Sequence, residues 1–79
     1  MKTVLYTLAA SNDLRMHRVG AKEIIEKVTL YAETGAGDVK PLVGRSGKRL
    51  RMGDYRGLFE EHAASIIVQA VGPRGAIYD

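Results

Sequence analysis

The chain contains no cysteine, and no stretch of it approaches the roughly 20 apolar residues that a membrane-spanning helix requires. Without cysteine there is neither a disulfide framework nor a thiolate zinc site, a composition typical of a reducing compartment. At the N-terminus a single lysine precedes only a short apolar stretch, which does not fit a secretory signal. The sequence also lacks low-complexity tracts and long internal repeats. We therefore expect a soluble, cytoplasmic protein that does not associate with a membrane.

The 79 residues predict one domain, spanning residues 1–79. The formal net charge of +3 is small, but residues 44–56 contain five basic side chains and a single acidic one, Asp54. The basic residues are Arg45, Lys48, Arg49, Arg51 and Arg56. A concentrated patch of this kind on an otherwise balanced chain indicates a localised site for an anion.

Apolar spacing and turn residues divide the chain into short elements. Residues 19–33 carry apolar side chains at helical spacing and form the clearest predicted helix. The segment before it reads as a strand over residues 2–8 and a short helix over residues 9–16, with Ser11, Asn12 and Asp13 as possible caps of a later start. Glycines and Pro41 predict an irregular connection over residues 34–47. Strands follow at residues 48–52, 55–61 and 65–71, the last apolar enough to be buried on both faces.

Gly53 and Asp54 predict a type II′ turn between two of these strands, since glycine suits the first central position of that turn. In this register Met52 lies opposite Tyr55 and Arg51 opposite Arg56, and Arg49 shares the face of Arg51. Like charges in direct opposition destabilise a sheet unless an anion neutralises them. A phosphate-rich ligand or an acidic partner would do so, whereas guanidinium groups splayed into water remain the alternative.

The predicted order is β-α-α-β-β-β, an α+β fold. Two N-terminal helices pack on one face of a small, mostly antiparallel four-stranded sheet, and the arginines lie on the other face. Glu60 and Glu61 are expected to be solvated charges that flank a turn, with the alternative that one of them tethers an arginine.

Three motifs in the second half of the chain resemble the RelE/ParE family of toxins from bacterial type II toxin–antitoxin systems. They are KPLVGR at residues 40–45, RLRMGDYRGLFE at residues 49–60 and VGPRGAIY at residues 71–78. The resemblance implies a RelE-like fold and an antitoxin partner that folds on binding, in a possible toxin–antitoxin hetero-oligomer. Members similar to RelE cut messenger RNA on the ribosome, and members similar to ParE poison DNA gyrase.

The resemblance also implies roles for individual residues. Arg56, Arg74 and Tyr78 would be catalytic, whereas Arg45, Lys48, Arg49 and Arg51 would bind RNA phosphates, and no metal or other cofactor is expected. Metal-free cleavage needs a proton acceptor for the attacking ribose 2′-hydroxyl, cations around the phosphate and a proton donor for the leaving oxygen. Arginine suits the second role and is a poor base.

Where the best-known nuclease of the family has lysines on the second strand, this chain has Arg49 and Arg51. The proton-accepting role therefore moves to Tyr78, or the activity is weakened. The sequence favours a ribosome-dependent mRNA interferase that inhibits translation, with a gyrase poison and a catalytically inactive, partner-binding relative as the alternatives.

Overall fold

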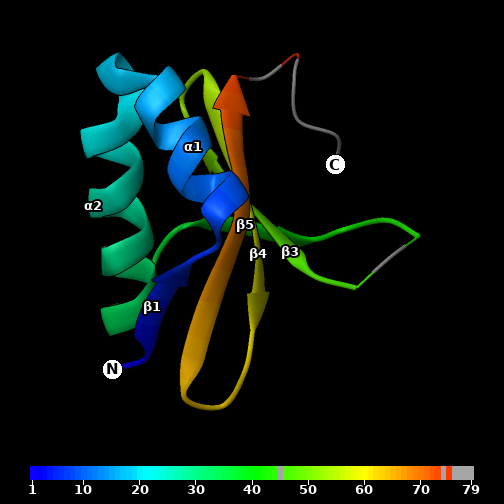
Figure 1. Cartoon of the computed structure of the whole chain (residues 1–79). Coiled ribbons are helices and arrows are strands. Elements are labelled where there is room, and N and C mark those ends of the chain that lie inside the picture. The colour runs from blue at the N-terminus through cyan, green and yellow to red at the C-terminus, as the bar shows by residue number, and fades with distance from the viewer. Residues whose placement is uncertain (45, 74, 76–79) are drawn as a thin grey trace.

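Seven elements make up the fold in a computed structural model that describes residues 1–44, 46–73 and 75. They are β1 (Thr3–Tyr6), α1 (Leu8–Met16), α2 (Arg18–Thr34), β2 (Asp38–Pro41), β3 (Lys48–Met52), β4 (Tyr55–Glu61) and β5 (Ser65–Pro73). The sheet has the order β1-β5-β4-β3-β2; β1 is parallel to β5, and the other pairs are antiparallel. Both helices lie on one face of it, as predicted (Figure 1). Neither helix is long and apolar enough, within the part described, to cross a bilayer.

The helix ends follow from local capping. Thr7 is the N-cap of α1, where its Oγ1 accepts a hydrogen bond from the Ala10 amide at 3.1 Å. The suggested caps Ser11, Asn12 and Asp13 lie inside the helix, so that suggestion was wrong. α2 ends where Gly35 adopts φ 78° and donates its amide to the Tyr31 carbonyl at 2.8 Å, a left-handed cap that glycine adopts without strain.

The core lies between the helices and the sheet. Ile24 and Val28 of α2 face Leu50, Phe59 and other buried side chains of the strands. α2 comes very close to the β3–β4 hairpin, because a Cβ added to Gly20 would lie 2.5 Å from the ring of Tyr55. The packing therefore leaves room only for glycine at this position unless the ring moves.

The sheet has five strands, not four, because β2 forms within the segment expected to be irregular. Val39 pairs with Leu50 of β3 and packs, partly buried, against the core. Pro41 ends this strand at the edge of the sheet, where a missing amide hydrogen is tolerated. Val39 therefore joins this edge strand to the core.

The predicted hairpin register is confirmed. Met52 pairs with Tyr55, and Arg51 with Arg56. Gly53 has φ 56°, and no described non-glycine residue has a positive φ, which fits a type II′ turn and not a type I′ turn.

β5 is central, between β1 and β4, but it is not buried on both faces as expected. Ile66, Val68 and Val71 are buried, whereas Gln69 is exposed where a bulge shifts the register against β4. Beyond the end of β1, α1 takes over the edge of β5: the carboxylate Oδ2 of Asp13 accepts the Val71 amide at 3.0 Å. One helix thus completes the hydrogen bonding of a strand that its parallel neighbour leaves early.

Candidate functional site

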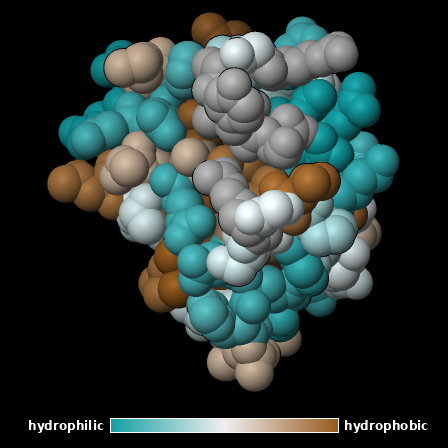
Figure 2. Space-filling model, turned by 90° about the vertical axis from the view of Figure 1, so that its right-hand side faces the viewer, coloured by the Kyte–Doolittle hydropathy of each residue, from teal (hydrophilic) through white to brown (hydrophobic). Residues whose placement is uncertain are grey.

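Basic side chains gather on the sheet face opposite the helices, here called the open face. Arg49, Arg51 and Arg56 point to this side because their alternating neighbours Leu50, Met52 and Tyr55 face the core. β2 adds Lys40, paired with Arg49, and Asp38, paired with Arg51. Figure 2 looks onto this side of the molecule, where hydrophilic residues surround smaller apolar areas.

Arg56 is buried and hydrogen-bonded to the hairpin turn. This residue is only 5% exposed to solvent. The guanidinium Nη1 donates to the carbonyls of Gly53 at 3.3 Å and Tyr55 at 3.2 Å. The hairpin turn therefore fixes the direction of this guanidinium before any ligand arrives, which lowers the entropy lost on binding.

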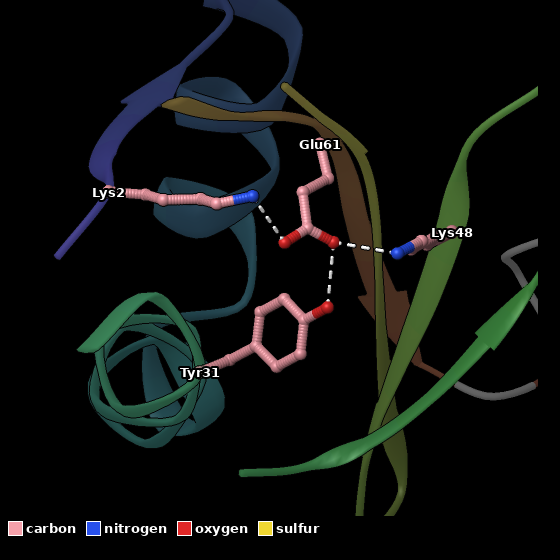
Figure 3. A network of polar contacts seen from close by, with 4 residues as sticks. All are labelled: Lys2, Tyr31, Lys48 and Glu61. Carbon is pink, nitrogen blue, oxygen red and sulfur yellow. Dashed lines mark hydrogen bonds and ion pairs between the residues drawn. The ribbon is translucent and has the colours of Figure 1, made fainter. Parts of the chain in front are cut away.

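Lys48 does not lie with the arginines. It points to the helix-covered side of the sheet, where its Nζ is 2.7 Å from Oε1 of Glu61. The same carboxylate accepts hydrogen bonds from Lys2 at 2.7 Å and from the hydroxyl of Tyr31 at 2.7 Å (Figure 3). Lys48 was expected to bind phosphate, but its register and its ion pair separate it from the open face.

Glu61 is the centre of this network rather than the solvated turn residue that was expected. Hydrogen bonds from Lys2, Lys48 and Tyr31 lower the pKa of its carboxyl from 4.5 to about 2. In return, the hydrogen bond to Glu61 raises the pKa of Lys48. Burial and then Glu61 raise the pKa of Tyr31. The network joins α2, β3 and β4 to the segment before β1, so it is a tertiary clamp.

Three of the predicted site residues, Arg45, Arg74 and Tyr78, lie outside the described residues. Sequence reasoning missed Lys40 as part of the charged face, because the segment around it was taken for a loop. The alternation of Asp38, Val39 and Lys40 was a signal that could have located β2 and placed Lys40 beside the arginines.

A hollow of about 430 Å³ lies between α2 and the end of β3. Leu30, Leu50 and Met52 give it an apolar floor, and Glu23 and Lys27 stand at its border. Leu30 and the nearby Ile25 are each 42% exposed. This surface suits an apolar side chain from a partner with charges beside it.

The open face places like charges directly across from each other twice, in the pairs Arg51–Arg56 and Lys40–Arg49. Direct opposition of like charges costs stability in a sheet. A bound phosphate would remove that cost and accept charge-assisted hydrogen bonds from guanidinium groups. No group of three or more His, Cys, Asp or Glu side chains in residues 1–44, 46–73 and 75 is placed to hold a metal ion.

Among the comparisons with known proteins, only the comparison with solved structures gives matches. No family model and no curated protein sequence matches the chain. YafQ from E. coli strain BL21(DE3) is similar over 100% of both chains, with TM-score 0.78 and 11% identity. The archaeal RelE–RelB complex from Pyrococcus horikoshii OT3 gives TM-score 0.76 and 20% identity over 96% of this chain and 98% of the other.

The RelB–RelE antitoxin–toxin complex from Methanococcus jannaschii gives TM-score 0.68 and 28% identity over 95% of each chain. These similarities confirm the RelE-like fold expected from the motifs.

Proposed function

We propose that this chain, which has the fold of the RelE-like toxins, is the toxin of a type II toxin–antitoxin system and an endoribonuclease that cleaves messenger RNA on the ribosome. The observation that carries the proposal is the convergence of Arg49, Arg51 and Arg56 on the face left open by the helices. The fold alone is shared by proteins with different targets, so the argument depends on this site.

The proposed reaction is an in-line transesterification. The ribose 2′-oxygen forms a bond to the adjacent phosphorus, and the bond from phosphorus to the 5′-oxygen of the next nucleotide breaks. A 2′,3′-cyclic phosphate and a 5′-hydroxyl result, so one proton leaves the 2′-oxygen and one is added to the 5′-oxygen. Negative charge accumulates on the phosphate oxygens in between, where fixed cations lower the barrier.

Arginine side chains supply those cations. In this proposal Arg49 and Arg51 grip the scissile phosphate and its neighbour, while Arg56 and Arg74 stabilise the additional charge. The fork of a guanidinium matches two phosphate oxygens and keeps its charge at any working pH. Arg56 suits this role because the turn carbonyls already orient it.

Proton transfer needs a different group, since a guanidinium does not act as a base near neutral pH. We assign that role to Tyr78, whose phenol would be acidified by neighbouring guanidinium groups. Arg45 remains a proposed phosphate contact. Positioning of the RNA by the ribosome would supply part of the rate through orientation.

The proposal includes a cognate antitoxin that inhibits the toxin. The structures of similar fold include an antitoxin–toxin complex from Methanococcus jannaschii and the DinJ–YafQ complex from E. coli. On this chain the exposed Ile25 and Leu30 of α2, next to the hollow, suit the apolar side of a partner helix.

The test is cleavage of a defined messenger RNA on programmed ribosomes, with the ends mapped by primer extension. Wild-type protein should cut within the decoding-site codon. Arg51→Ala and Arg56→Ala should lower the rate at least tenfold, because each removes a charge that meets the phosphate. Arg18→Ala is the matched control, since it removes an exposed arginine from the helix layer.

The two site variants separate loss of fold from loss of chemistry. Arg56 is buried, so its removal perturbs packing, whereas Arg51 is exposed and its removal does not. Intact RNA with wild-type protein would overturn the nuclease. DNA damage in cells that make the protein would then favour a gyrase poison.

A further inference from the structure

The charges of the open face form two rows that run across the strands. One row contains Lys40 of β2 and Arg49 of β3, and the next contains Arg51 of β3 and Arg56 of β4. Toward β5 the described residues that continue these rows are uncharged: Leu58 and Ala70 continue the first row, and Gly72 continues the second. Each row is therefore a pair of cations of limited width, sized for one small anion.

The distance between the rows is set by the strand itself. Arg49 and Arg51 are two residues apart on β3, which places them about 7 Å from each other along the sheet. Six backbone bonds separate neighbouring phosphates of an RNA strand, so an extended strand can cover about the same distance. Two successive phosphates can thus each meet one row if the RNA backbone follows the direction of β3.

We infer that the open face binds two successive phosphates of a single RNA strand, one at Arg51–Arg56 and the next at Lys40–Arg49, with Lys40 as a positioning residue. This inference rests on the proposed nuclease function and adds to it the path of the substrate. Lys40 stands one row away from Arg56, so it holds the neighbouring phosphate and not the one that reacts.

Asp38 supports this assignment of the rows. It pairs with Arg51 at the edge of the sheet, so the row of Arg51 and Arg56 has a carboxylate at one end. The row of Lys40 and Arg49 begins at the same edge with a cation, Lys40. An RNA backbone should therefore approach the edge strand at Lys40 and be repelled from it at Asp38.

The experiment measures binding of a fluorescently labelled 2′-O-methyl RNA decamer by anisotropy over a salt series. The methyl group blocks the nucleophile, so the probe reports binding without cleavage. Lys40→Ala should weaken binding about 3- to 10-fold at low salt. It should also make the slope of log K against log salt shallower by about 0.7, which is the contribution of one phosphate contact to a single strand. Lys40→Arg should restore both values, and Asp38→Asn should tighten binding.

Lys22→Ala is the matched control, because Lys22 is exposed on α2 in the layer that covers the opposite face of the sheet. Competition with unlabelled 2′-O-methyl oligomers tests the two-phosphate requirement. Lys40→Ala should weaken the binding of a trinucleotide, which has two internucleotide phosphates. It should leave the binding of a dinucleotide, which has one, unchanged.

Three results would overturn the inference. The first is a slope of log K against log salt that is the same for Lys40→Ala and Lys22→Ala. The second is an equal loss of affinity for the dinucleotide and the trinucleotide in Lys40→Ala. The third is no binding of the decamer by the wild-type protein. The nuclease itself is judged by ribosomal cleavage. If the wild type cleaves RNA on the ribosome but Lys40→Ala does not change RNA binding, the proposed function stands and only the substrate path is rejected.

Discussion

Replacement of Glu61 by glutamine is the sharpest test of how the helix layer is clamped to the sheet. The carboxylate accepts hydrogen bonds from Lys2, Lys48 and Tyr31, each at 2.7 Å. A glutamine has the same shape but only one oxygen that can accept hydrogen bonds. Its amide NH2 group is a donor and would face a lysine ammonium, which is also a donor. The variant therefore loses at least one charged hydrogen bond and the negative charge that holds both lysines.

The magnitude follows from the pKa of the carboxyl. The shift from 4.5 to about 2 corresponds to a ceiling of about 3 kcal/mol at neutral pH. The side chain of Glu61 is 18% exposed, but that of Lys48 is 42% exposed, so water screens part of the interaction. We expect Glu61→Gln to lower the free energy of unfolding by about 1 to 2 kcal/mol, or the melting temperature by roughly 5 to 10 °C.

The pH dependence gives the test its sign. Because the folded state lowers this pKa, the stabilisation is complete above about pH 4.5 and is lost as the pH falls toward 2. The difference in unfolding free energy between wild type and Glu61→Gln should therefore shrink at pH 3 to less than half of its value at pH 7. Other carboxylates titrate equally in both proteins and cancel from the difference.

Urea unfolding followed by circular dichroism at both pH values measures this difference. Glu60→Gln is the matched control, because Glu60 is the adjacent carboxylate on the other face and is more exposed. It should change the unfolding free energy by less than about 0.5 kcal/mol. Equal losses in the two variants, or a Glu61→Gln difference that does not shrink in acid, would refute the network as a source of stability.

Three further predictions concern other parts of the molecule. Asp13→Ala leaves the Val71 amide without its acceptor and should cost about 1 to 2 kcal/mol of unfolding free energy in the same urea assay, whereas Asp13→Asn should retain most of it. Gly20→Ala should lower the melting temperature despite the better helix propensity of alanine, because its Cβ meets the Tyr55 ring; an unchanged value would show that the ring moves aside. Arg56→Lys keeps the charge but loses the guanidinium fork, so it should reduce cleavage on ribosomes at least tenfold; full activity would mean that charge alone suffices.

Short-range patterns in the sequence determined one helix, the register of the hairpin and the side of the sheet on which the arginines lie. Apolar side chains at helical spacing placed α2, and Gly53 set the turn that fixes the register of Arg51 against Arg56. The resulting alternation placed the arginines on the side away from Leu50 and Met52. These features depend on neighbours within a few residues, so the sequence alone was sufficient.

Tertiary structure decided the rest. Whether residues 38–41 became a strand depended on the edge that β3 offered, and that pairing brought Lys40 to Arg49. Glu61 meets partners that are 59, 30 and 13 residues away in the chain, and these contacts withdrew Lys48 from the charged face. The side of a strand on which a residue lies can be read locally, but the charge that it meets there depends on segments that only folding brings together.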